Sequence, residues 1–126
     1  MRLVDTSSWI EQLRRGGDPA VRERVEALLS SGEAAWCPIV RLELWNGARG
    51  HHERTVLLEM EKEIKSLEIG SPVWDGAAML ARSARERGIT VPETDLLVAA
   101  CAEHHGVALE HNDSHFGLIA ALPKKR

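Results

Sequence analysis

The sequence lacks any apolar run long enough to cross a membrane. A transmembrane helix needs about 20 consecutive apolar residues, and no run in these 126 residues approaches that length. The first residues also lack a basic segment followed by an apolar stretch and a small-residue cleavage site, so we expect no signal peptide. These absences predict a cytoplasmic protein without membrane partners.

The sequence also has few cysteines and only a small net charge. The two cysteines, Cys37 and Cys101, are isolated in apolar stretches, which predicts buried thiols and excludes a disulfide framework. The net charge of −3 argues against a protein that coats nucleic acid by bulk electrostatics. It leaves room for an enzyme that acts on nucleic acid through a local site. Ser7 and Ser8 lack the glycine-flanked turn of a serine nucleophile, so covalent catalysis is not expected.

What remains is the pattern of an ordinary globular domain. With 44% hydrophobic and 28% charged residues, the chain is long enough for one domain with its own core. We expect that domain to span residues 1–122, with a solvated basic tail at 123–126. Apolar runs predict strands at 3–4, 34–37, 67–69 and 107–109. Helical periodicity and capping residues predict helices at 8–15, 19–31, 38–47, 53–65, 71–87, 95–105 and 114–121.

Short strands that alternate with helices are typical of an α/β domain with a parallel sheet. In such sheets, ligands bind beyond the carboxyl ends of the strands, where the chain leaves for the next helix. The junctions that follow the strands are therefore where functional residues are expected.

Four acidic residues stand at junctions or beside apolar sequence: Asp5, Glu43, Asp95 and Asp113. Taken singly, each aspartate is most simply a helix cap, since aspartate is favoured at such junctions. Glu43 lies inside the apolar segment "PIVRLELW". It either has a buried partner or emerges on a solvated stripe of its helix.

Taken together, the four acids support a different interpretation. If the strand ends face one way, the carboxylates gather at one edge of the sheet, where they repel and must be neutralised. A hard divalent cation does this, and Mg²⁺ or Mn²⁺ suits an all-carboxylate site better than Zn²⁺. Such ions activate a water, bind a scissile phosphate and offset charge on the attacking and leaving oxygens. The set therefore favours metal-assisted hydrolysis of a phosphoester.

A zinc site is the weaker alternative. His111 and His115 are four residues apart, but the segment between them has the pattern of a helix start, and no third ligand stands at metalloprotease spacing. We interpret them as histidines of the surface or of the rim of the site.

Four stretches then resemble a known family: "LVDTSSWIE", "PIVRLELWNGAR", "PETDLLVAACAEHHGVAL" and "HNDSHFGLIA". In order and spacing they resemble PIN-domain ribonucleases of the VapC toxin type, from prokaryotic toxin–antitoxin pairs, over nearly the whole chain. The resemblance implies a three-layer α/β/α domain with a parallel sheet of about four to five short strands. Such chains commonly end in a further strand, whereas this one ends in "ALPKKR". The last edge strand is therefore expected to be short or missing.

The resemblance also implies a function, an endoribonuclease that depends on Mg²⁺ or Mn²⁺. Asp5 and Asp95 would be direct metal ligands, and Glu43 and Asp113 would act directly or through waters. Three further residues are implied near the site: Thr6 or Ser7 as the hydroxyl beside Asp5, and Asn112 as a contact to the site or the substrate.

The partners implied by the resemblance are RNA, a second copy of the chain in a homodimer, and a VapB-like antitoxin. The C-terminal segment of such an antitoxin wraps the toxin and can place an arginine in the acidic pocket, in a heterotetramer or a larger assembly. Two alternatives stay open from the residues alone. One is a catalytically idle PIN-like binding module, and the other is a phosphodiesterase or DNA nuclease with the same metal site.

Overall fold

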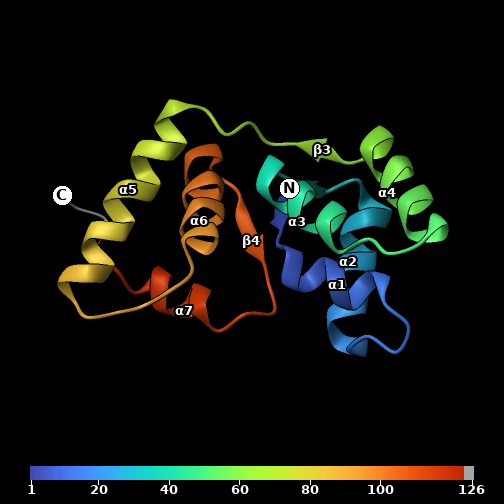
Figure 1. Cartoon of the computed structure of the whole chain (residues 1–126), viewed down its shortest axis with the longest axis horizontal. Helices are drawn as coiled ribbons and strands as arrows, with labels where there is room; N and C mark the ends of the chain where they lie inside the picture. Colours follow the sequence, from blue (N-terminus) through green and yellow to red (C-terminus); the bar gives the residue numbers. More distant parts are fainter. Residues whose placement is uncertain (124–126) are drawn as a thin grey trace.

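A four-stranded sheet forms the centre of the molecule in a computed structural model, which describes residues 1–123 (Figure 1). Its strands run in the order β3-β2-β1-β4, and every neighbouring pair is parallel. The strands are β1 (Arg2–Val4), β2 (Ala34–Trp36), β3 (Lys65–Ser66) and β4 (Ala108–Glu110). Most of the expected basic tail, residues 124–126, lies outside the described residues.

Helices connect and cover these strands. They are α1 (Thr6–Leu13), α2 (Pro19–Ser31), α3 (Pro38–Gly47), α4 (His51–Glu63), α5 (Ser71–Glu86), α6 (Glu93–His105) and α7 (His115–Ala120). Helices α5 and α6 lie together at one end of the molecule, and α4 lies at the opposite end (Figure 1). No helix within residues 1–123 is long and apolar enough to span a bilayer. The predicted α/β class with a parallel sheet is confirmed.

The core surrounds the two central strands. Leu3, Val4 and Trp36 are almost completely buried, as expected for parallel strands that are covered on both faces. Trp9 from α1 meets Trp36 edge to face, with 6.4 Å between the ring centroids. The thiols of Cys37 and Cys101 are free and buried, as the sequence predicted.

The third strand lies two residues earlier than predicted. Residues 67–69 are not a strand; the pairing with β2 occurs at Lys65 and Ser66, which are both exposed at the sheet edge. Leu67 is buried, and its N–H donates to the carbonyl of Trp36. The apolar signal at 67–69 therefore came from packing on the core and not from the strand pairing itself.

The number of strands and the start of α6 also differ in detail from the expectation. The described residues form four strands, so the sheet stands at the lower end of the expected range. Helix α6 begins at Glu93, two residues before its predicted start, which places Asp95 inside the first turn and not at a cap.

Candidate metal centre

The carboxyl ends of β1 and β4 bring two distant parts of the chain together. These strands are parallel neighbours, with Val4 opposite Glu110. Just beyond them, the N–H of Asp5 donates to the carbonyl of Glu110 at 2.9 Å. The segment 111–114, which carries Asn112 and Asp113, therefore leaves the sheet beside Asp5. This is the edge at which ligands of parallel sheets bind.

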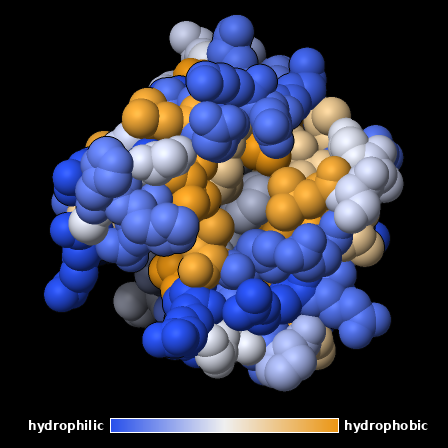
Figure 2. Space-filling view, turned by 90° about the vertical axis from the view of Figure 1, so that its right-hand side faces the viewer, coloured by the Kyte–Doolittle hydropathy of each residue, from blue (hydrophilic) through white to orange (hydrophobic). Residues whose placement is uncertain are grey.

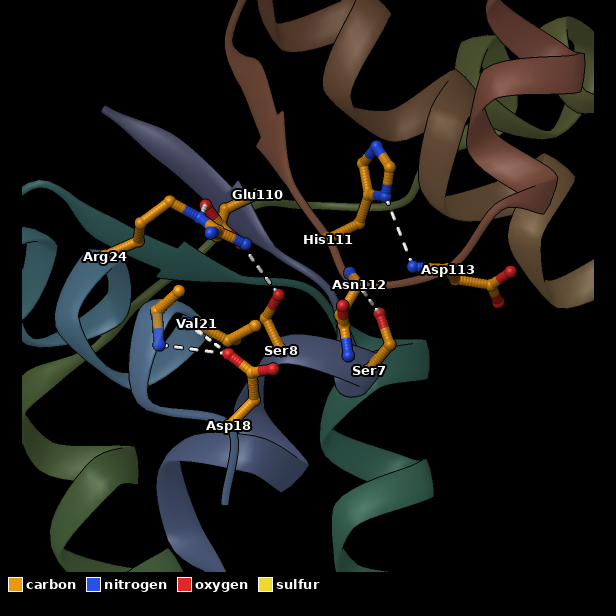
Figure 3. Close-up of polar contacts among 10 residues, drawn as sticks. Ser7, Ser8, Asp18, Val21, Arg24, Glu110, His111, Asn112 and Asp113 are labelled. Atoms are coloured by element: carbon orange, nitrogen blue, oxygen red, sulfur yellow. Dashed lines mark hydrogen bonds and ion pairs between the residues drawn. The ribbon is translucent and has the colours of Figure 1, made fainter.

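Asp5 is both a helix cap and a buried carboxylate. It is 4% exposed, and its Oδ2 accepts from the N–H of Ser7 at 3.0 Å and from the Ser7 hydroxyl at 2.6 Å. The Ser7 hydroxyl in turn accepts from the backbone N–H of Asn112 at 2.9 Å (Figure 3). The capping interpretation of Asp5 is thus correct, and Ser7 also ties this carboxylate to the loop after β4.

Glu43 projects from α3 toward the start of α1. Its side chain is half-buried, and its Oε1 accepts from the hydroxyl of Thr6 at 2.6 Å. Thr6 and Ser7 therefore hold one carboxylate each. Of the two alternatives for Glu43, the structure favours a bonded carboxylate over a solvated one, because Thr6 on a neighbouring helix donates to it.

Asp95 has an unusual environment for a carboxylate. It is 8% exposed, and its Oδ2 has no hydrogen-bond partner among the described residues. Burial raises the pKa of Asp95 to about 7, with further increases from the negative charges of Asp113 and Asp5. The sequence-based interpretation of Asp95 as a helix cap is wrong, since it makes no capping bond to α6.

Asp113 faces Asp95 from the loop before α7. Burial acts to raise the pKa of Asp113, but the hydrogen bond from the N–H of His115, at 2.9 Å, and the proton shared with Asp95 lower it overall. The two carboxyl groups therefore titrate as a pair that resists carrying two negative charges.

A histidine completes this group, which sequence reasoning had placed only at the surface or rim. Nδ1 of His115 lies 2.8 Å from Oδ1 of Asp113 and 3.3 Å from Oδ2 of Asp95. Ligand atoms of these three residues lie within 4.8 Å of one another. The zinc pair weighed from the sequence does not form, because the ring of His111 stacks on Phe116, with 4.9 Å between centroids.

The structure thus brings together part of the expected quartet. Asp95 and Asp113 approach within ligand distance of each other and of His115. Asp5 is near enough for its charge to raise the pKa of Asp95. Glu43 stands outside the closest group and reaches it through Thr6, the neighbour of Asp5. Asn112 takes part through its backbone, whereas its side chain is exposed.

Another buried carboxylate, missed in the sequence, lies at the end of β4. Glu110 is 7% exposed. Its oxygens accept from Nε and Nη2 of Arg24, at 3.0 and 3.2 Å, and from the hydroxyl of Ser8 at 2.8 Å (Figure 3). Its position at the end of β4, where side chains alternate between faces, was the only available signal. Every oxygen has a partner, which makes Glu110 an anchor for the loop.

The donor set fits a divalent cation. The carboxylates of Asp95 and Asp113 gather with that of Asp5 nearby, and one buried oxygen, Oδ2 of Asp95, makes no hydrogen bond within the described residues. Hard cations such as Mg²⁺ and Mn²⁺ prefer such oxygen ligands. A bound cation would supply the missing partner and relieve the repulsion between the carboxylates.

Comparison with known proteins agrees with this geometry. The sequence matches the PIN domain family over residues 2–122. It is 36% identical to Ribonuclease VapC11 from Mycobacterium tuberculosis, in a match that covers 97% of this chain and 93% of the relative.

Solved structures match the fold as well. The VapBC2 complex from Rickettsia felis, bound to a promoter DNA fragment, contains a chain with a TM-score of 0.77 and 16% identity, covering 98% of this chain and 93% of that one. VapC20 from Mycobacterium tuberculosis, a toxin that cleaves the sarcin–ricin loop, matches with a TM-score of 0.72 and 18% identity, covering 100% and 99%. Because the family model covers residues 2–122 and a VapC ribonuclease is 36% identical over nearly the whole chain, this chain belongs to the PIN domain family, among the VapC ribonucleases.

Proposed function

We propose that this protein is a metal-dependent endoribonuclease and the toxin of a VapBC-type toxin–antitoxin pair. The observation that carries the proposal is Asp95: a buried carboxylate with one unpartnered oxygen that faces Asp113 and His115. An unsatisfied buried charge costs stability. It is expected where a cation binds during function.

Each acidic residue has a distinct part in this proposal. Asp5 and Asp95 hold the metal directly, and Asp113 completes the group. Glu43 contributes directly or through a water. Bound Mg²⁺ or Mn²⁺ would supply Lewis-acid stabilisation of the scissile phosphate.

The hydroxyl groups position these carboxylates. Ser7 fixes the orientation of Asp5 and links it to the backbone of Asn112. Thr6 fixes Glu43 in the same way. The exposed side chain of Asn112 is free to meet RNA at the mouth of the site.

An RNA cleavage assay tests the proposal with the substitutions Asp5→Asn and Asp95→Asn. Both variants should keep the fold, measured by circular dichroism, and lose cleavage by at least about 100-fold, as expected when a charged group that stabilises the transition state is removed. Full activity of both variants in the presence of Mg²⁺ or Mn²⁺ would contradict the proposed site.

The two alternative functions make different predictions. An idle binding module would bind RNA without cutting it, and crystals soaked in Mn²⁺ would show no density among the four acids. A phosphodiesterase or DNA nuclease would cut DNA or small phosphoesters in preference to RNA. A panel of RNA, single-stranded DNA and small phosphoesters, each with both metals, separates these functions.

The antitoxin has a candidate binding surface next to the acids. A groove of about 300 Å³ runs between α1, α3 and α4, on the side of the molecule that Figure 2 turns toward the viewer. Apolar side chains such as Ile10, Leu13 and Val56 line it, and Glu43 belongs both to the groove and to the acidic set. A peptide with apolar residues and an arginine complements such a surface.

Co-purification with a VapB-like antitoxin tests the groove. Leu13→Asp should weaken the complex at least 10-fold, since it places a charge in the apolar lining. Leu58→Asp is the matched control, because Leu58 is 53% exposed on α4 and does not line the groove. Equal losses in both variants would contradict the assignment. The homodimer stays a prediction, to be checked by measuring the mass of the free toxin in solution.

A further inference from the structure

We propose that His115 is a metal ligand, and that its nitrogen shifts the metal preference of this centre from Mg²⁺ toward Mn²⁺. The inference rests on the proposed metal site but goes beyond it, because the expected ligand set consisted of carboxylates alone. Its basis is the position of one imidazole nitrogen relative to two carboxylate oxygens.

The spacing of the three side chains matches ligands of a single ion. Nδ1 of His115 is 2.8 Å from Asp113 Oδ1 and 3.3 Å from Asp95 Oδ2. Two adjacent ligands of an octahedral ion, each about 2.1 Å from the metal, are about 3 Å apart. The observed distances lie on either side of that value, so an ion could contact all three residues without a large rearrangement.

The same atoms do not satisfy one another as hydrogen-bond partners. Both Nδ1 of His115 and Oδ2 of Asp95 are buried, and within residues 1–123 they are in ion-pair contact but make no bond with acceptable hydrogen-bond geometry. Buried polar groups are nearly always paired in native proteins. The side chain of Asp95 is only 12% exposed, so bulk water does not readily reach this oxygen. The two atoms lie 3.3 Å apart, a spacing that suits two ligands of one ion.

The local backbone explains how His115 arrives there. It is the first residue of α7, and its own N–H donates to Oδ1 of Asp113 at 2.9 Å. One residue therefore fixes the orientation of a carboxylate through its backbone and presents a nitrogen beside that carboxylate through its side chain. The imidazole is 40% exposed, which leaves its other edge open to solvent or substrate.

A nitrogen ligand changes which ion the centre favours. Mg²⁺ takes oxygen ligands almost exclusively and keeps several waters, whereas imidazole binds first-row transition metals well. Replacing one oxygen position by His115 should therefore strengthen Mn²⁺ binding more than Mg²⁺ binding. The preference for Mn²⁺ over Mg²⁺ depends on the His115 side chain and can be measured without RNA cleavage.

Metal titration of the metal-free protein tests the inference by calorimetry, without any RNA. His115→Ala should weaken Mn²⁺ binding about 10–100-fold and leave Mg²⁺ affinity nearly unchanged, so that the Mn²⁺/Mg²⁺ ratio falls. His115→Asp should reverse the preference by restoring an oxygen ligand. His104→Ala is the matched control, because His104 lies in the last turn of α6, at the opposite end of that helix from Asp95, and it should preserve the ratio.

Pulsed EPR of the Mn²⁺-loaded protein gives a direct readout. Hyperfine coupling to a ligand nitrogen should appear in the wild type and in His104→Ala, and it should be absent in His115→Ala. Mn²⁺ that binds with no nitrogen coupling, or a Mn²⁺/Mg²⁺ ratio unchanged by His115→Ala, would overturn the inference. Failure of the proposed function looks different: the nitrogen coupling would be present while no RNA is cleaved.

Discussion

Glu110 and Asp95 are two carboxylates with the same burial and opposite environments. They are 7% and 8% exposed, and both lie near the edge of the sheet where the acids gather. Glu110 is held by a bidentate contact to Arg24 and by the hydroxyl of Ser8. Asp95 faces another carboxylate, and within residues 1–123 its Oδ2 makes no hydrogen bond, only an ion-pair contact to His115 at 3.3 Å.

The difference separates a structural carboxylate from a functional one. Pairing makes a buried charge tolerable, and Glu110 has that pairing within the protein itself. Asp95 has only the contact to the partly exposed His115, and its raised pKa records the cost. Proteins keep such unsatisfied groups mainly where a ligand later satisfies them. Burial alone therefore does not identify a site, whereas a buried carboxylate that faces a second carboxylate and makes no hydrogen bond indicates one.

The strongest test of this comparison is metal-linked stability. Mn²⁺ at about 100 times its Kd should stabilise the wild-type fold by about 2.7 kcal/mol, which raises the Tm by roughly 10 °C for a domain of this size. Asp95→Asn should remove most of that gain, because it removes a charged ligand. Glu110→Gln should keep it. Differential scanning fluorimetry with and without Mn²⁺ measures all three, and equal Mn²⁺ responses in the two variants would break the comparison.

The next largest effect concerns Glu110 in the absence of metal. Glu110→Gln should lower the free energy of unfolding by about 2 kcal/mol, since a buried ion pair and a charged hydrogen bond to Ser8 are both weakened. Half of the Arg24 side chain is exposed, so solvent recovers part of that loss. Urea denaturation measures the change.

A surface pair provides the control for Glu110. Glu59 contacts Lys62 at 3.4 Å, and both side chains are more than half exposed. Glu59→Gln should therefore change stability by less than about 1 kcal/mol. If Glu110→Gln were as mild as this control, Glu110 would not be the anchor that the comparison requires.

The pH dependence of the metal-free protein is the third test. The pKa of Asp95 is about 7 in the folded protein, above its ordinary value of 3.8. The folded state therefore binds a proton that the unfolded state has already released. The Asp95 contribution to stability is complete below pH 3.8 and is lost as the pH rises to about 7.

The measurement is the difference between wild type and Asp95→Asn across that range. Relative to the variant, the wild type should lose on the order of 1–2 kcal/mol between pH 4 and pH 8, since one pKa unit corresponds to about 1.4 kcal/mol and relaxation reduces the effect. Asp95→Asn should consequently be the more stable protein at pH 8. A difference that is independent of pH would show that Asp95 is not strained in the metal-free state.

Much of the fold could be predicted from the sequence because local signals agree with the tertiary structure. Helices α2 and α3 have the predicted bounds, 19–31 and 38–47, since proline and glycine mark their ends. The third strand was misplaced because two exposed residues, Lys65 and Ser66, carry the pairing while the apolar residues follow them. Edge strands of this kind have no strong pattern of their own.

The candidate site was less predictable, since its geometry depends on side chains from distant elements. The strand-to-helix junctions indicated Asp5 and Asp113, and a carboxylate within an apolar helix indicated Glu43. His115 was missed because its role depends on Asp113 receiving its N–H at the start of α7. Glu110 was missed because its partner Arg24 lies 86 residues away in the chain. Neither contact has a local sequence signature.

The smallest predicted effect is a difference in Mn²⁺ affinity between variants that lack the hydroxyl of Ser7 and variants that lack the hydroxyl of Thr6. Ser7→Ala removes the 2.6 Å bond to buried Asp5 and the acceptor for Asn112, so Mn²⁺ should bind about 10-fold more weakly. Thr6→Val releases Glu43, which lies outside the group within 4.8 Å, and should have a smaller effect. Ser31→Ala, which loses only an exposed bond to the carbonyl of Leu28, is the control. Calorimetry ranks the three variants. If Thr6→Val proved the more damaging, Glu43 would be the direct ligand and Asp5 chiefly the cap of α1.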